Sequence, residues 1–384
     1  MRTGAKVAVA LGAAVVAVGA PVAFVAHGAG APGRADSADA WWERLRRAPS
    51  LVLASPERDS AVRVGGQPVG HLLLTARRTE TRALPTRSPV VAIAPLGDWV
   101  AVATFDDGAF VIEEDGKAQR VKGVNAVNAL AWIGPDLVIA SDDGVYVSVP
   151  GQVKKIASGP FSAIGRVDRW WYLAGRSGVL RLSPAKGEIG PWVKEPAVRV
   201  AQPTSVGMCG AHQLCVGAVD GLRKYRVDAA DGHLTEIESA GALPEPFVTA
   251  VSSGSEQWTP DWNGVVWDPW AGTSGGGLVR LGDPPMAPAD GLPEGRISPR
   301  ALDVYEDLAF AGTPRGLLVA HARSAALVPV GGPVSAVAAA GRGEAWCGLP
   351  GQVVLVHVDL LPEGAMPPDP VDPMEPLAQS WRMP

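Results

Sequence analysis

The sequence is poor in cysteine and in charge. Its 384 residues include three cysteines, Cys209, Cys215 and Cys347, and only 19% of them are charged, with a formal net charge of -5 at pH 7. Three cysteines are too few for a disulfide framework, and no Cys or His spacing resembles a zinc site. Because the chain has no basic field to attract a phosphate backbone, nucleic acid is excluded as a partner.

Helical periodicity and catalytic motifs are missing as well. No helical pattern occurs between Leu51 and Leu360, which argues against a parallel sheet with helices between its strands. There is no nucleophile elbow, phosphate-binding loop, dinucleotide fingerprint or H-E-x-x-H motif. We therefore expect no cofactor, no metal and no catalytic residue. Carboxylates and imidazoles that could carry chemistry are spread over different parts of the chain: Asp168, Glu256, Asp261, Asp268, His71, His212, His233, His321 and His357.

A repeated unit fills the middle of the chain instead. Each unit has an apolar run, a turn with a glycine, and a second apolar run, as in "VAVATFDDGAFVI", "LVIASDDGVYVSV" and "AFAGTPRGLLVA". Such hairpins at a period of roughly 40 residues are typical of the four-stranded blades of a β-propeller. The turn glycines of the seven units are Gly108, Gly144, Gly178, Gly221, Gly277, Gly316 and Gly351. The fold prediction is therefore an all-β, seven-bladed propeller spanning residues 51–360.

The last unit lacks its outer strand. After "QVVLVHVDL" the chain enters a proline-rich segment, residues 361–384, which we expect to be a disordered tail. The segment from His71 to Leu84 precedes the first unit and can supply the missing strand, which would close the ring and remove two sheet edges. An alternative with eight blades uses Leu51 to Gly70 as part of an additional blade.

Several units resemble the two-component regulator propeller repeats, whose motif is Trp-x-Gly-Thr-x-x-Gly-Leu followed by a strand. The match is good over Trp270-Ala271-Gly272-Thr273 and from Phe310 to Leu317, and it is partial in the other units. The resemblance implies an extracytoplasmic propeller that binds a ligand or a protein. It does not imply a sensor-kinase role, because the sequence contains no kinase or DNA-binding module.

The N-terminus predicts export. Arg2 and Lys6 precede an uncharged run of 20 residues, 7–26, so residues 1–31 are predicted to be a signal peptide or an uncleaved membrane anchor. Residues 32–50 are predicted to be a linker with a short helix. Either form places the remainder of the chain outside the cytoplasm, in the periplasm or secreted, with membrane contact through residues 7–26 in the anchored form.

Tryptophan is the aromatic residue that this chain uses most, with 13 copies against 6 Phe and 4 Tyr. Trp270 occupies the position that Phe310 and Trp346 hold in other units, so we expect it in the core. Other tryptophans nearby fall in an insertion that lengthens one glycine spacing to 56 residues. Because insertions in propellers carry function, we predict a ligand-binding surface there, formed by Trp258, Asp261, Trp262, Asn263 and Trp267.

Cys209 and Cys215 flank a predicted hairpin turn. In an exported protein they can form a disulfide, but the strand register decides whether they face each other, so a reduced pair is an equal alternative.

These observations favour a non-catalytic binding module in the cell envelope, whose partner is an unidentified protein or glycan. Two alternatives stay open. One is a propeller enzyme of the glycosidase or lyase type, acting on a carbohydrate or a lactone. The other is a membrane-tethered scaffold subunit of an envelope complex.

Overall fold

The computed structural model describes residues 62–64, 67–69, 74–149, 152–176, 178–183, 193–239, 243, 245–253, 269–281, 296–321 and 324–360. All of them belong to one compact unit, Ser50–Pro384, and every regular element among them is a β-strand. No helix in this part of the chain is long and apolar enough to span a membrane. The predicted export signal or anchor (1–31), linker helix (32–50) and tail (361–384) lie outside the described residues.

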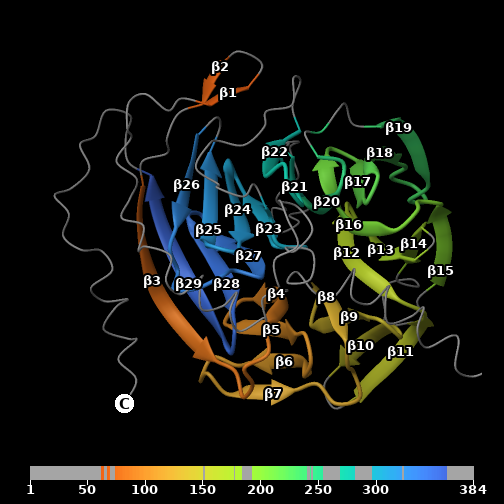
Figure 1. The fold of residues 1–384 in the computed structure, drawn as a ribbon. Coiled ribbons are helices and arrows are strands. Elements are labelled where there is room, and N and C mark those ends of the chain that lie inside the picture. The colour runs from red at the N-terminus through yellow and green to blue at the C-terminus, as the bar shows by residue number, and fades with distance from the viewer. Residues whose placement is uncertain are drawn as a thin grey trace, which may run out of the picture. The chain divides into compact units, whose positions relative to one another are not determined.

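Seven antiparallel sheets, which we call blades 1 to 7, are arranged around a common centre (Figure 1). In each blade the first strand lies innermost and the later strands lie progressively outward. Blade 1 is β4 (Val90–Leu96), β5 (Trp99–Thr104), β6 (Gly108–Ile112) and β7 (Ala118–Arg120), and blade 2 is β8 (Val127–Ile133), β9 (Asp136–Ser141), β10 (Gly144–Val149) and β11 (Gln152–Ser158). Blade 3 is β12 (Phe161–Val167), β13 (Trp170–Gly175), β14 (Gly178–Ser183) and β15 (Val193–Val198), and blade 4 is β16 (Pro203–Gly210), β17 (Gln213–Ala218), β18 (Gly221–Val227) and β19 (Leu234–Ser239).

The remaining blades follow the same order. Blade 5 has three strands among the described residues, β20 (Val248–Ser252), β21 (Trp270–Thr273) and β22 (Leu278–Arg280). Blade 6 is β23 (Leu302–Tyr305), β24 (Leu308–Thr313), β25 (Gly316–His321) and β26 (Ser324–Val328). Blade 7 is β27 (Ala336–Gly341), β28 (Glu344–Leu349), β29 (Gln352–Leu360) and β3 (Leu74–Ala83), so its outer strand precedes blade 1 in the sequence.

The prediction of a seven-bladed, all-β propeller is confirmed. Of the stretch from Leu51 to Gly70, the described residues form only β1 (Val62–Val64) and β2 (Gln67–Val69), which pair with each other and with no blade. Strand β3 pairs with β29 along nine residue pairs, from Ala83 opposite Gln352 to Leu74 opposite Leu360. Arg78 of β3 also donates a hydrogen bond from Nη2 to the carbonyl of Val330, at 3.1 Å.

The repeat motif has a physical cause in its turns. In four units a Thr or Ser at the end of the second strand donates its hydroxyl to the carbonyl of the turn glycine, which closes the hairpin without exposing a buried polar group. The pairs are Thr104 with Gly108, Ser141 with Gly144, Thr273 with Gly277 and Thr313 with Gly316, at 2.9–3.2 Å. The threonine of the motif is therefore a turn residue and carries no chemistry.

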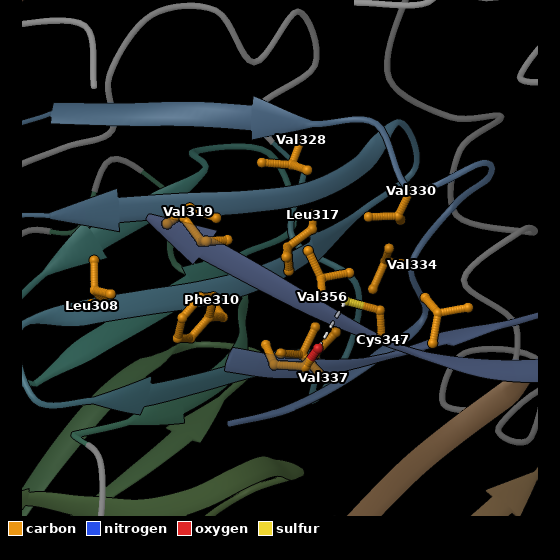
Figure 2. Packing of buried hydrophobic residues seen from close by; sticks show 14 of the residues in the cluster. Leu308, Phe310, Leu317, Val319, Val328, Val330, Val334, Val337, Cys347 and Val356 are labelled. Atoms are coloured by element: carbon orange, nitrogen blue, oxygen red, sulfur yellow. Dashed lines mark hydrogen bonds between the residues drawn. The ribbon is translucent and has the colours of Figure 1, made fainter. Parts of the chain in front are cut away.

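The first glycine of the motif lets neighbouring blades pack closely. A Cβ atom on Gly348 of β28 would lie 2.7 Å from Cβ of Val90 in blade 1, and one on Gly312 of β24 would lie 2.6 Å from the carbonyl oxygen of Val334, just before β27 of blade 7. Large side chains fill the space beside these contacts. Figure 2 shows Phe310 of blade 6 beside Val337 and Cys347 of blade 7 in one buried cluster.

In blade 5, Trp270 occupies the position that Phe310 holds in blade 6. This residue is 6% exposed and packs against Leu302 and Leu318 of blade 6, which confirms that it belongs to the core. Its role is to fill the space between two blades.

Candidate functional site

A cavity of about 730 Å³ occupies the centre of the propeller. The innermost strands of all seven blades contribute to its wall, namely β4, β8, β12, β16, β20, β23 and β27. Neighbouring inner strands run parallel to each other: Ser162 near the start of β12 contacts Pro203 at the start of β16, and Gly165 further along β12 lies against Val206 further along β16. The cavity therefore has two distinct ends, one where the inner strands begin and one where they turn into the second strands.

The wall is largely apolar. Among the lining residues are Ile93, Leu130, Val251, Leu302 and Val337, together with several alanines. At Gly165 and Gly207 a Cβ atom would meet the carbonyl oxygen of the next inner strand at 2.5–2.6 Å, so glycine is required for the inner strands to approach this closely. A few polar side chains interrupt the wall, and these define what the channel can bind.

Arg300 crosses the channel at the end where the inner strands begin. It precedes β23 of blade 6, and its Nη1 donates to the backbone carbonyl of Ser162, 3.0 Å away in blade 3 on the opposite side. Its Nε is buried and has no hydrogen-bond partner, and its backbone has a left-handed φ of 61°. Burial lowers the pKa of Arg300 to about 10, and the carboxylate of Asp142 partly opposes this effect.

Asp303, on β23, joins three blades. Its Oδ1 accepts hydrogen bonds from Ser252 Oγ in blade 5 (3.0 Å) and from the backbone N–H of Val304 (2.9 Å). Its Oδ2 accepts one from the backbone N–H of Ala339 in blade 7, at 2.9 Å. Burial raises the pKa of Asp303, although these three hydrogen bonds act in the opposite direction. Because both oxygens are engaged, this carboxylate is a structural link between blades.

The other end of the channel carries Arg166 and Asp168. Arg166 is the sixth residue of β12, about 13 Å from Ser162 at the usual rise of a strand. Its Nε donates to the carbonyl of Asp168 at 2.6 Å, and its guanidinium lies 5.6 Å from the ring centre of Trp171. Burial lowers the pKa of Arg166, and the nearby Asp168 partly offsets this effect.

An imidazole from the next blade reaches the same end. Nδ1 of His212, in the turn between β16 and β17, lies 2.6 Å from Oδ2 of Asp168, in the turn between β12 and β13. Both residues have left-handed backbones, with φ of 53° and 54°. The two turns of neighbouring blades are thus joined at the rim of the channel.

Two tryptophans flank the rim on blades 1 and 2. Trp132 lines the cavity and donates its Nε1–H to the carbonyl of Ala94, at 2.9 Å. The ring centre of Trp99, at the start of β5, lies 6.4 Å from that of Trp132, with an angle of 51° between the planes. Trp99 is 48% exposed, so this end of the channel presents an aromatic surface to solvent.

The predicted ligand-binding residues Trp258, Asp261, Trp262, Asn263 and Trp267 lie outside the described residues. They belong to the connection between β20 and β21, which joins the inner strand of blade 5 to its second strand. Their role stays a prediction.

The cysteines lie in blade 4 and blade 7. Cys209 and Cys215 form a disulfide with a Cα–Cα distance of 5.5 Å. The ladder of β16 and β17 has a bulge between Met208 and Gly210, and this extra residue brings Cys209 to Cys215 across the hairpin. Cys347 is buried and free.

No group of three or more metal-ligating side chains occurs within the described part of the chain. Three of the histidines there, His212, His321 and His357, lie against carboxylates, whereas for His233 only the backbone N–H donates to a carboxylate, that of Asp231. His321 lies 2.8 Å from Asp307, and His357 lies 3.2 Å from Glu344 and 3.0 Å from Asp359.

Sequence reasoning missed Arg300, Asp303 and Arg166 as channel residues. Arg166 and Asp303 interrupt otherwise apolar inner strands, and Arg300 stands two residues before one. An arginine or aspartate in the first apolar run of a repeat unit is therefore the signal that could have identified them. Asp168 and His212 were both named as candidates, but their 44-residue separation hid that they meet.

Comparison with known proteins shows similarity of fold. No family model and no curated protein sequence matches the chain. The solved extracellular domain of a putative hybrid two-component system protein from B. thetaiotaomicron superposes with a TM-score of 0.51 at 14% identity, over 71% of this chain and 39% of that one. Streptogramin B lyase gives a TM-score of 0.56 at 11% identity, over 74% of this chain and 98% of that one.

The N-terminal domain of Nup159 is a third similar structure, with a TM-score of 0.50 at 10% identity over 76% of this chain and 98% of that one. The chain spans about two fifths of the two-component domain. The resemblance to propellers of two-component proteins is thus confirmed at the level of the fold. Because the three similar proteins differ widely in kind, the fold alone assigns no activity.

Proposed function

We propose that this protein is an exported, non-catalytic propeller that binds a ligand in its central channel as a module of the cell envelope. The observation that carries the proposal is the channel itself. It is a cavity of about 730 Å³ with apolar walls and a few fixed polar groups, and this combination is characteristic of small-molecule sites.

Three observations support a location outside the cytoplasm. The N-terminal sequence has a positive start and an uncharged run of 20 residues. The Cys209–Cys215 disulfide suits an oxidising compartment. A similar propeller is the extracellular domain of a two-component system protein.

The rim beside Trp99 and Trp132 is the face through which a ligand enters. At the opposite end, Arg300 spans the channel from blade 6 to blade 3 and narrows it. A protein or glycan partner would meet the same rim. The inserted residues between β20 and β21 follow the end of the inner strand of blade 5, where the other blades have their rim turns.

The proposal can be tested by filling the channel. Ala92 lines the cavity, so an Ala92→Cys variant can be labelled there with a bulky maleimide. Burial raises the pKa of the Cys347 thiol, and the other two cysteines are in a disulfide on another blade, so position 92 is the reactive site.

Wild type, unlabelled variant and labelled variant would be incubated with the soluble exported fraction of the source organism, and bound solutes identified by mass spectrometry. We expect the first two to retain the same solute and the labelled protein to lose it. Equal retention by the labelled protein would place binding elsewhere.

A second candidate is a propeller enzyme of the lyase or glycosidase type. It is favoured by the His212–Asp168 pair at the rim, since a carboxylate that orients an imidazole is a common arrangement for a general base. The glycosidase form has less support, because both oxygens of Asp303 are occupied by structural hydrogen bonds. Conversion of the retained solute by wild type but not by His212→Gln would favour the enzyme, and an unchanged solute would favour the binding module.

A further inference from the structure

Among the charged side chains that line the channel, the acids have hydrogen-bond or ion-pair partners and the arginines do not have carboxylate partners among the described residues. Four ionisable side chains contribute to the wall, Arg166, Asp168, Arg300 and Asp303. The two acids are engaged, Asp168 by His212 and Asp303 by three hydrogen-bond donors. Neither arginine forms a salt bridge with a carboxylate among the described residues, and each donates only to a backbone carbonyl.

Arg300 is the less compensated of the two. Arg166 has the carboxylate of Asp168 close by and lies against the face of Trp171. Among the described residues Arg300 forms no ion pair and is partly compensated only by the field of Asp142, and its buried Nε has no acceptor. Charged side chains are rarely buried without a partner, because the loss of hydration costs several kcal/mol per ion. A guanidinium held in this way inside a cavity is a receptor for an anion, with which it can form charge-assisted hydrogen bonds.

The walls define the remainder of the ligand. Between Arg300 and the rim the channel is bounded by side chains such as Leu130, Ile164 and Val251, which offer no hydrogen bonds. An apolar body covers these side chains without giving up hydrogen bonds to water. An apolar or aromatic body would gain about 25 cal/mol for each Å² that it buries.

We propose that the channel binds an organic carboxylate with an apolar body, whose carboxylate group pairs with the guanidinium of Arg300. This inference rests on the proposed function and names the ligand class of the same site. The carboxylate supplies the counter-charge that Arg300 lacks, and the apolar body lies along the inner strands towards Trp132.

The inference is tested with three probes that share one apolar body, phenylacetate, phenylacetamide and phenethylamine, titrated calorimetrically into the full chain. Wild type is expected to bind phenylacetate at least about tenfold more tightly than the neutral or the cationic probe. Arg300→Met is expected to lose at least about tenfold in affinity for phenylacetate while keeping its affinity for phenylacetamide. Arg300→Lys keeps the positive charge but loses the planar set of N–H donors of the guanidinium, and it is expected to retain most of the preference for the anion.

Arg120→Met is the matched control, because Arg120 lies exposed on β7, away from the channel. It should bind phenylacetate as wild type does. Circular dichroism and a melting curve establish that each variant is folded.

Two results would overturn the inference. Equal binding of phenylacetate and phenylacetamide would show that the channel is a site but not one for an anion, which leaves the proposed function intact. Binding of phenylacetate that is unchanged in Arg300→Met would place the anion elsewhere. If no probe binds wild type, the anion inference fails, and the solute-retention experiment with labelled Ala92→Cys decides separately whether the channel is a site at all.

Discussion

Replacing Arg300 by methionine should make the propeller more stable. Burial lowers the pKa of this side chain from 12.5 to about 10. At 1.36 kcal/mol for each tenfold change in the protonation equilibrium, the difference corresponds to a destabilisation of about 3 kcal/mol from keeping the side chain charged in the folded state. Methionine has a similar length and carries no charge, so it removes this term.

The Arg300→Met variant also loses a stabilising contact across the channel. The hydrogen bond from Nη1 to the carbonyl of Ser162 disappears, which costs about 1–1.5 kcal/mol, while water in the cavity can replace the donor. The net expectation is a gain of about 1–2 kcal/mol in the free energy of unfolding. For a domain of this size the gain corresponds to a rise of roughly 2–3 °C in the melting temperature.

The pH dependence follows from the direction of the shift. Because the folded pKa lies below the unfolded value, the unfolded chain holds the proton more tightly, and the destabilisation is fully present at every pH below about 10. It declines only as the pH rises through 10 and beyond. The advantage of Arg300→Met should therefore be constant between pH 6 and pH 9.

Urea denaturation followed by tryptophan fluorescence measures this difference, with Arg300→Lys as the variant that keeps the charge and should show no gain. A loss of stability of more than about 1 kcal/mol in Arg300→Met would refute the reasoning. The hydrogen bond across the channel would then be a strut that holds blades 3 and 6, and Arg300 would need no ligand to explain its presence. A gain in stability together with a loss of anion binding would be a trade of stability for function.

Four further outcomes are expected. Gly348→Ala should lose about 1–3 kcal/mol in urea denaturation, because its Cβ would lie 2.7 Å from that of Val90, whereas Gly332→Ala, whose Cβ would lie 3.9 Å from its nearest neighbour, should be near neutral. Cys209→Ser should lose about 2 kcal/mol by the same measurement, as expected for a short disulfide loop, and dithiothreitol should no longer affect its melting. Hydrogen bonds from Ser141, Tyr146 and Lys155 outweigh burial and lower the pKa of Asp143. Wild type should therefore lose stability relative to Asp143→Asn as the pH falls through 4 and below, and an equal pH dependence of the unfolding free energy in the two proteins would contradict this. Removal of the chain through Arg82 takes away most of β3 and should expose the edge of β29, with association in light scattering and faster proteolysis; an unchanged monomer would show that β3 does not close the ring.

The repeat made most of the fold predictable. Turn glycines such as Gly316 and core positions such as Trp270 recur at the blade period, and each is a local requirement of a hairpin or of blade packing. From that recurrence the sequence predicts the number of blades and the positions of the first three strands in each blade.

The candidate site could not be predicted in the same way. Arg300 and Ser162 are 138 residues apart, and their contact depends on the closure of the whole ring. Asp168 and His212 meet because two turns of neighbouring blades are both left-handed, which the composition of those turns does not reveal. The disulfide depends on a bulge in β16, and a shift of register by one residue would have separated the two cysteines.

A crystal structure of the propeller grown with phenylacetate tests the central claim most directly. The account predicts electron density for the ligand inside the channel, with its carboxylate within hydrogen-bonding distance of the Arg300 guanidinium and its ring against the inner strands. A channel that holds only water, with phenylacetate absent or bound on the outer surface, would contradict it.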